Sequence, residues 1–205
     1  MDSPTSRTLT SAASWFLQVA AHAEGRLDEA GLGAWNVRDL LGHTSRALAT
    51  IESYLEADAA RDIEVDLVDA AAYYRATQAA LADGEAVTQR GRAAGVALGE
   101  DPLAALQGLA TRVLERVRSA PEHAVMATPF GVMTLEGYLP TRIVELTVHT
   151  CDLAAALDLD AAVPTDAAAA SFAVLGALAA GQGSAAPALL ALTGRRPLPP
   201  GYSLM

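Results

Sequence analysis

The sequence predicts an all-α protein, a helical bundle with one crossover connection. Of its 205 residues, 52% are hydrophobic but only 5% are aromatic. Alanine and leucine supply most of the apolar content, which favours closely packed helices over a β-sandwich. Apolar residues recur at helical spacing between recognisable caps, and no segment is convincing as a strand. The length suits one well-buried domain better than two.

The first two helices are expected over residues 6–30 and 36–56. The first carries apolar residues at helical spacing from Trp15 to Ala23 and ends in the glycines of "AGLGAW". The second begins in "WNVRD", where Asn36 can cap the free amides and Asp39 lies in the first turn. Its core stripe comprises Val37, Leu41, Thr44, Leu48, Ile51 and Leu55.

The middle of the chain holds one further helix over 65–84, ending at Gly84, and a clearer one over 101–120. Residues 85–98 are rich in glycine and fit no element clearly. The helix over 101–120 has Asp101 as its cap, Pro102 at its first position and arginines in its last turn. Residues 121–134 are expected to form a connection with a short extended piece at most.

The last long helix begins at Thr134 or Pro140 and ends near Leu157. Another is expected over 163–183, capped by Thr165 or Asp166, and a short helical turn then precedes a proline-rich end. We therefore expect a helical bundle over 1–160, with residues 161–205 forming a C-terminal helix and a tail that pack on it.

Charge and cysteine content exclude several classes of function. The net charge is −10 and all basic residues are arginines, which form no basic stripe. Binding to nucleic acid or to an anionic membrane is therefore disfavoured. Cys151 is the single cysteine, so an internal disulfide is impossible and a cytoplasmic location is expected.

The segment "TRIVELTVHTCDL" places charged residues in an otherwise apolar helix. Glu145 and His149 are four residues apart, so their side chains lie on the same face. That face also carries Tyr138, Arg142 and Asp152. A polar face turned toward the interior of a bundle is how metal and cofactor sites are built there. The pair therefore offers two ligands for a divalent metal.

A third ligand must come from another helix, and His43 in "VRDLLGHTSRAL" stands at the edge of the core stripe. Simpler interpretations compete for each residue. Glu145 and His149 can form an intrahelical ion pair, and His43 can be a hydrogen-bonded core residue. Arg142 can neutralise Glu145, and Asp152 can face water. Taken one residue at a time, these simpler interpretations are favoured.

Two motifs together change this balance. "WNVRDLLGHTSRA" and "RIVELTVHTCDLAAALDLD" closely resemble the mycothiol-dependent maleylpyruvate isomerase family, a branch of the DinB-like metalloenzyme superfamily. The family pattern W-x-V-R-D-L-x-x-H is matched from Trp35 to His43. The pattern R-x-x-E-x-x-V-H-x-x-D-L-A is matched from Arg142 to Ala154. The end, "ALLALTGRRPLPPGYSL", is also similar to the family's, whereas 58–133 carries no motif of it.

The resemblance implies a DinB-like four-helix core in which His43, Glu145 and His149 bind one divalent metal, usually zinc. It also implies a low-molecular-weight thiol, commonly mycothiol, as co-substrate. The expected activity is that of an isomerase or S-transferase on a small electrophilic, anionic substrate, with a homodimer as a further expectation. A metal-dependent hydrolase that needs no thiol and a non-catalytic metal-containing binding protein remain as alternatives.

The sequence departs from the family in two places. The family's isomerase has an additional C-terminal domain that contributes an arginine to the active site, and its Cys-Pro-Gly before the tryptophan is "GLGA" here. We predict that residues after Gly183 lie over the bundle and bring Arg195 or Arg196 toward an anionic substrate. The alternative is that both arginines are merely solvated. The residues expected to act beside the metal are therefore Asp152, Arg142, Tyr138 and Arg196.

Overall fold

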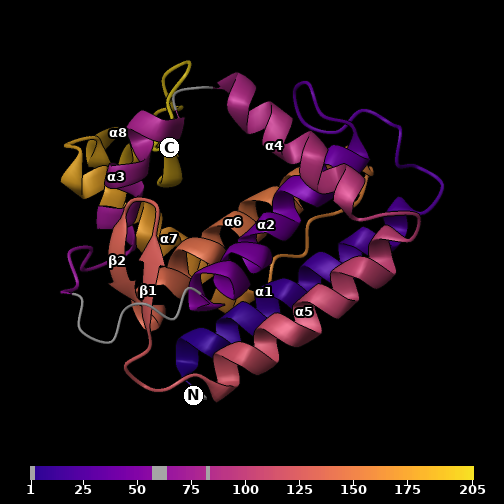
Figure 1. Cartoon of the computed structure of the whole chain (residues 1–205). Helices are drawn as coiled ribbons and strands as arrows, with labels where there is room; N and C mark the ends of the chain where they lie inside the picture. The colour runs from indigo at the N-terminus through magenta and orange to yellow at the C-terminus, as the bar shows by residue number, and fades with distance from the viewer. Residues whose placement is uncertain (1–2, 57–63, 82–83) are drawn as a thin grey trace.

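The computed structural model describes residues 3–56, 64–81 and 84–205 (Figure 1). Within these residues the chain forms eight α-helices, one 3-10 helix and one β-hairpin. The helices are α1 (Pro4–Ala20), η1 (Ala21–Ala23), α2 (Val37–Glu56), α3 (Ala70–Leu81), α4 (Gly84–Ala97), α5 (Pro102–Ser119), α6 (Leu135–Ala156), α7 (Thr165–Gly181) and α8 (Ala185–Leu192). The predicted all-α, DinB-like fold is confirmed.

Four helices, α1, α2, α5 and α6, enclose the main hydrophobic core (Figure 1). Each contributes side chains with no exposed surface, among them Leu9, Phe16, Leu40, Leu48, Leu106, Val113, Leu139 and Leu146. Burial of each such side chain contributes about 1.5–3 kcal/mol. The packing of α6 against α1 on one side and α2 on the other fixes the relative position of the two helices that carry the sequence motifs.

The predicted caps of α2 and α5 are confirmed. The side-chain oxygen of Asn36 accepts a hydrogen bond from the amide of Asp39 at 2.9 Å, and Asp39 accepts one from the amide of Asn36 at 3.4 Å. Asp101 accepts from the amide of Ala104 at 3.0 Å. The cap of α6 is Thr134, whose hydroxyl accepts from Gly137, and Pro140 lies inside that helix.

The first helix is shorter than predicted. It ends at Ala20, continues as η1 to Ala23 and is followed by turns rather than by helix up to residue 30. Gly25 has φ of 74°, a backbone conformation that other residues rarely adopt and that cannot continue a helix. The helix therefore stops at this glycine, well before those of "AGLGAW".

The middle of the chain divides differently from the prediction. The helix expected over 65–84 begins only at Ala70, where Asp69 accepts a hydrogen bond from the amide of Ala72 at 2.7 Å. The amides of Asp66 and Leu67 instead donate to the carbonyl of Val132, which holds this segment extended. Gly84 does not end that helix but begins α4, so most of the unassigned stretch 85–98 is helical.

The connection over 121–134 contains a hairpin that the sequence did not show as paired strands. Strand β1 (Val125–Thr128) pairs antiparallel with β2 (Gly131–Thr134). Met126 lies opposite Met133, and neither side chain has exposed surface. In strands of four residues, the alternation of apolar and polar side chains is too short to be distinguished from a loop, so the sequence did not predict the hairpin.

The C-terminal part begins with α7, which packs on α6, and ends in a tail attached to α7 and α8. The cap of α7 is Pro164 and not Thr165 or Asp166, although Asp166 accepts from its neighbour's amide at 2.9 Å. In the tail, Tyr202 donates to the carbonyl of Ser184 at 3.0 Å. The division at residue 160 stays a prediction. Of the helices described, none is both long and apolar enough to cross a membrane.

Glycines bring the backbones of α2 and α4 into direct contact. A Cβ atom built on Gly42 would lie inside van der Waals distance of the backbone of Gly95. A Cβ atom on Gly95 would lie 2.8 Å from the carbonyl oxygen of Arg38. Side chains larger than hydrogen would therefore push α4 away from the first turns of α2, where His43 is located.

We predict that Gly42→Ala destabilises the protein by about 1–3 kcal/mol, because the added methyl must displace backbone atoms. Urea unfolding followed by circular dichroism measures this. The matched control is Gly176→Ala in α7, where a Cβ atom meets nothing within 4 Å. That change should stabilise the protein by about 0.5–1 kcal/mol through helix propensity. Equal effects of the two substitutions would contradict the close contact.

Candidate metal centre

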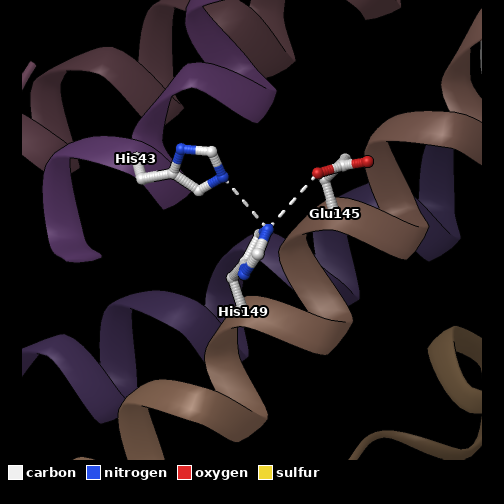
Figure 2. A group of neighbouring side chains, drawn as sticks. All are labelled: His43, Glu145 and His149. Atoms are coloured by element: carbon white, nitrogen blue, oxygen red, sulfur yellow. Dashed lines mark hydrogen bonds and ion pairs between the residues drawn. The ribbon is translucent and has the colours of Figure 1, made fainter. Parts of the chain in front are cut away.

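The three predicted metal ligands converge between α2 and α6. Figure 2 shows His43 of α2 facing Glu145 and His149, which lie on successive turns of α6. Nε2 of His43 is 3.2 Å from Nε2 of His149, which is 3.4 Å from Oε2 of Glu145. Among the described residues, these three form the one group of His, Cys, Asp and Glu with spacing suited to a metal ion.

Two of the three separations between ligand atoms fit a tetrahedral ion, and all three ligand atoms lie within 4.8 Å of one another. Zinc binds imidazole nitrogen and carboxylate oxygen at about 2.0–2.1 Å, so two ligand atoms at tetrahedral angles are about 3.3 Å apart. The two short separations, 3.2 and 3.4 Å, match this value. Three protein ligands leave a fourth position for water or a substrate, as in catalytic and unlike closed structural sites.

Hydrogen bonds orient both ligands of α6. Nδ1 of His149 donates to Oδ2 of Asp152 at 3.0 Å, which directs Nε2 toward the other ligands. The hydroxyl of Tyr74, on α3, donates to Oε1 of Glu145 at 2.9 Å and so leaves Oε2 for a metal. Asp152 therefore contacts one candidate ligand and Tyr74 the other, while a catalytic role for Asp152 stays a prediction.

His43 is oriented mainly by packing. Its ring lies 4.3 Å from that of Trp35, centroid to centroid, and the indole nitrogen of Trp35 donates to the carbonyl of Thr88 at 3.0 Å. Nδ1 of His43 is buried and has no hydrogen-bond partner in the part of the chain that the structure describes. The tryptophan of the first motif thus positions the ring and connects α4 to the site.

The charges of the three ligands differ in the metal-free protein. Burial, reinforced by the charge of His149, lowers the pKa of His43 to about 4. Burial also acts to lower the pKa of His149, but hydrogen bonds to Asp152 and Glu145 outweigh it and raise that pKa to about 9. Burial acts to raise the pKa of Glu145, but the bond with His149 and the charge of Arg142 hold it at about 2. A metal ion must therefore displace one proton at neutral pH, from His149.

Arg142 and Tyr138 lie on the same face of α6, one and two turns before Glu145, respectively. The Tyr138 hydroxyl donates to the hydroxyl of Thr50 at 3.0 Å, and its ring packs under the guanidinium of Arg142. Arg142 makes no ion pair with Glu145 that meets hydrogen-bond or salt-bridge distance within the described chain. Tyr138 is therefore a core residue that supports Arg142, and among the described residues neither side chain forms a hydrogen bond or ion pair with the candidate ligands.

The tail arginines are not brought to the ligands. Arg195 and Arg196 are exposed, and their backbone amides donate to the carbonyl of Leu190. No hydrogen bond or ion pair between described residues connects either side chain to His43, Glu145 or His149. A catalytic role for Arg196 therefore stays a prediction.

Tyrosines of α3 are the part of the site that the sequence analysis missed. Four of the chain's five tyrosines lie near Arg142 or Glu145: Tyr54, Tyr73, Tyr74 and Tyr138. The signal was the pair "YY" in a chain with only 5% aromatic residues. Without a contact between α3 and α6, however, nothing connected that pair to the motif of α6.

Metal-free protein should be most stable near pH 6.5. The unfolded pKa of both histidines is about 6.5. The raised pKa of His149 stabilises the folded protein fully below pH 6.5, and this stabilisation is lost as the pH rises through about 9. The lowered pKa of His43 has the opposite effect. Its contribution to stability is complete above pH 6.5 and is lost as the pH falls through about 4. The free energy of unfolding should fall by about 1–3 kcal/mol on each side of pH 6.5, giving an acid limb and an alkaline limb of the stability curve.

Urea unfolding of chelator-treated protein at pH 5, 6.5 and 9 measures both limbs. His149→Gln should remove the alkaline limb and also reduce the acid limb, because the charge of His149 helps to lower the pKa of His43. His43→Gln should remove the acid limb and leave the alkaline limb in place. An alkaline limb that persists unchanged in His149→Gln would show that another group causes it.

Comparison with known proteins agrees with this geometry. The family model described as the mycothiol maleylpyruvate isomerase N-terminal domain matches residues 7–154. The match spans α1 to α6 and includes all three candidate ligands, while α7, α8 and the tail lie beyond it. No curated protein and no solved structure matches the chain. Since the matched segment covers more than half of the sequence, the chain belongs to the mycothiol maleylpyruvate isomerase N-terminal domain family.

Proposed function

We propose that the protein is a metal-dependent enzyme that uses a low-molecular-weight thiol, most simply mycothiol, either to isomerise a small electrophilic acid or to form a thioether with it. The observation that carries the proposal is the spacing of Nε2 of His43, Nε2 of His149 and Oε2 of Glu145, which suits an open three-ligand site. Zinc is the ion whose preferred ligands and distances fit best. The family's association with mycothiol supports the choice of thiol.

A divalent ion in this site would lower the pKa of a thiol that enters the open position and so supply a thiolate near neutral pH. The protein's own residues fix where this happens. Asp152 keeps Nδ1 of His149 protonated and Nε2 free to ligate, and Tyr74 restrains Glu145 to one oxygen. The site is thus held on two packed helices rather than on loops.

The thiolate sulfur then forms a bond to an electrophilic carbon of a conjugated double bond, whose electrons move to the adjoining carbonyl. If rotation follows and the carbon–sulfur bond breaks, the thiol is regenerated and the product is the geometric isomer. If the adduct takes up a proton and is released, the product is a thioether. The shape of the pocket and the delivery of a proton to the adduct would select between these outcomes.

Hydrolysis is the less favoured activity of the same ligands. A one-metal hydrolase normally places a general base beside the attacking water. Asp152 already accepts a hydrogen bond from His149, and Glu145 is the one acidic residue of the described chain in the ligand group. A thiol needs no such base, because the metal and the solvent suffice to remove its proton. A binding protein without activity is the remaining alternative.

We predict that protein purified without added metal contains about one divalent ion per chain, which elemental analysis measures. His149→Ala should lower the affinity at least about 100-fold, because it removes one of three ligands. His123→Ala is the matched control, since this histidine is exposed in the loop before β1 and should leave the metal content unchanged. Equal metal content in both variants would refute the site.

Turnover of an electrophilic unsaturated acid should require both metal and thiol. We expect the metal-loaded protein to act on it with mycothiol and to lose all activity without thiol or after chelation. Thiol consumption identifies an S-transferase, and isomerisation without consumption identifies an isomerase. Turnover that persists without thiol would establish the hydrolase instead.

A further inference from the structure

Helix α7 has an outer face without a charged side chain. No charged residue occurs between Asp166 and Arg195, although 19% of the chain is charged. Along most of α7 the exposed residues lie on one side of the helix and are apolar: Ala169, Phe172, Ala173, Gly176, Ala177 and Ala180. A surface helix normally carries charged or polar residues on its outer side, and a helix that is apolar all round is normally covered. We therefore expect a partner on this face.

Apolar surface extends from α7 onto its neighbours. Phe172 is 60% exposed and lies next to the midpoint of the helix, which extends from Thr165 to Gly181. A groove of about 450 Å³ lies between α7, the first turns of α1 and the start of α3. Ala173 and Ala177 belong both to the groove and to the exposed face, and Val68, which also lines the groove, is 77% exposed. The groove and the face thus form one continuous apolar surface.

Opposite charges stand at the two ends of this surface. Asp166 is exposed in the first turn of α7, where it accepts a hydrogen bond from Ser11 of α1 at 3.0 Å. Arg75 of α3 is exposed at the other end, since its Nη1 would lie 3.4 Å from a Cβ atom built on Gly181. Within the described chain neither Asp166 nor Arg75 has an ion-pair partner. Both lie on the side of α7 that borders the groove, because α1 and α3 form the groove's other walls.

The order of charges makes the surface complementary to itself. If two copies of α7 pack antiparallel about a two-fold axis, each end of one helix faces the opposite end of the other, and equivalent edges meet. Asp166 of one copy then lies near Arg75 of the other copy, and this contact occurs twice. The two Phe172 side chains meet near the axis, because each is close to the middle of its helix. A parallel pairing would instead bring like charges together at both ends.

Net charge and area limit what such a contact can be. Each chain carries a net charge of −10, so two copies repel each other across most of their surface, and a contact between them is favoured where charge is absent. The outer side of α7 measures about 25 Å by about 10 Å in projection. A standard interface buries about 800 Å² per partner, so the groove walls on α1 and α3 must contribute as well. The expected dimer is therefore a weak one.

We propose that α7 forms the interface of a homodimer, in which it packs antiparallel on α7 of a second copy. The apolar face with Phe172 at its centre supplies the affinity, whereas the exposed pairs of Asp166 with Arg75 set the direction and register of packing. Helix α7 lies beyond the segment that the family model matches. The inference is independent of the proposed reaction.

Sedimentation velocity over a concentration range of about 1–500 µM tests the proposal. The mass of the wild type should rise from 21.1 kDa toward twice that value. Phe172→Glu should raise the dimer Kd at least about tenfold, because it buries a charge at the centre of the interface. Val96→Glu on α4 and Leu192→Glu on α8 are matched controls, since these side chains are 73% and 70% exposed outside α7. Both should leave the Kd unchanged.

A charge exchange tests the antiparallel direction. Asp166→Arg and Arg75→Asp should each raise the Kd about tenfold, because like charges then meet at both ends. An equimolar mixture of the two variants should dimerise as the wild type does, because every end again joins an acid with a base. The double variant that carries both substitutions in one chain should also recover the wild-type Kd. A loss of folding in either single variant could not be repaired by mixing, and thermal midpoints measured beforehand identify it.

Several results would overturn this interface. One is a wild type that stays at 21.1 kDa over the whole range, which would leave the face to another occupant. Others are a dimer that persists unchanged in Phe172→Glu, or one that only Leu192→Glu dissociates. If the mixture of charge variants is no tighter than either variant alone, the antiparallel arrangement is wrong. Metal content does not enter any of these measurements, so failure of the proposed reaction would leave the interface untouched.

Discussion

The burial of a charged helix face governs this structure. Arg142, Glu145 and His149 lie on the side of α6 that faces α2 and α3 rather than solvent, where an uncompensated charge costs several kcal/mol. Tyr74 and Asp152 provide hydrogen bonds, tyrosine rings cover the guanidinium, and His149 shares its proton with Glu145. Helix α3 thus supplies contacts to the charged residues of α6 that α6 itself does not provide, from Tyr74 to Glu145 and from Tyr73 to Arg142.

The need to hold His43 beside Glu145 and His149 explains the close approach of α2 and α4. His43 completes the ligand group only if α2 stays in register with α6, and its ring is pressed in place by Trp35. Trp35 is in turn held by the carbonyl of Thr88 on α4, and the glycine contact between Gly42 and Gly95 brings α4 near enough for that bond. The glycine of α4 therefore helps to position His43 on α2, because it allows α4 to come close enough to hold Trp35.

What could be predicted from the sequence was local. The caps Asn36 and Asp101 act within their own first turns, so their function follows from the adjacent residues alone. The i, i+4 spacing of Glu145 and His149 likewise settles that they share a face. The hairpin and the start of α3 depend instead on contacts between distant segments, such as the bonds from Asp66 and Leu67 to Val132. No local pattern encodes those bonds.

The distribution of roles within the site follows from which groups are already satisfied. Glu145 and His149 have their outer atoms bonded to Tyr74 and Asp152, so the atoms facing His43 are the ones that a cation could bind once it displaces the proton of His149. Arg142 has its Nε bonded to Thr141 and its faces covered by tyrosine rings, so its charge acts on Glu145 through space. The guanidinium of Arg142 and the two candidate ligands of α6 thus lie on one helix, less than two turns apart in sequence.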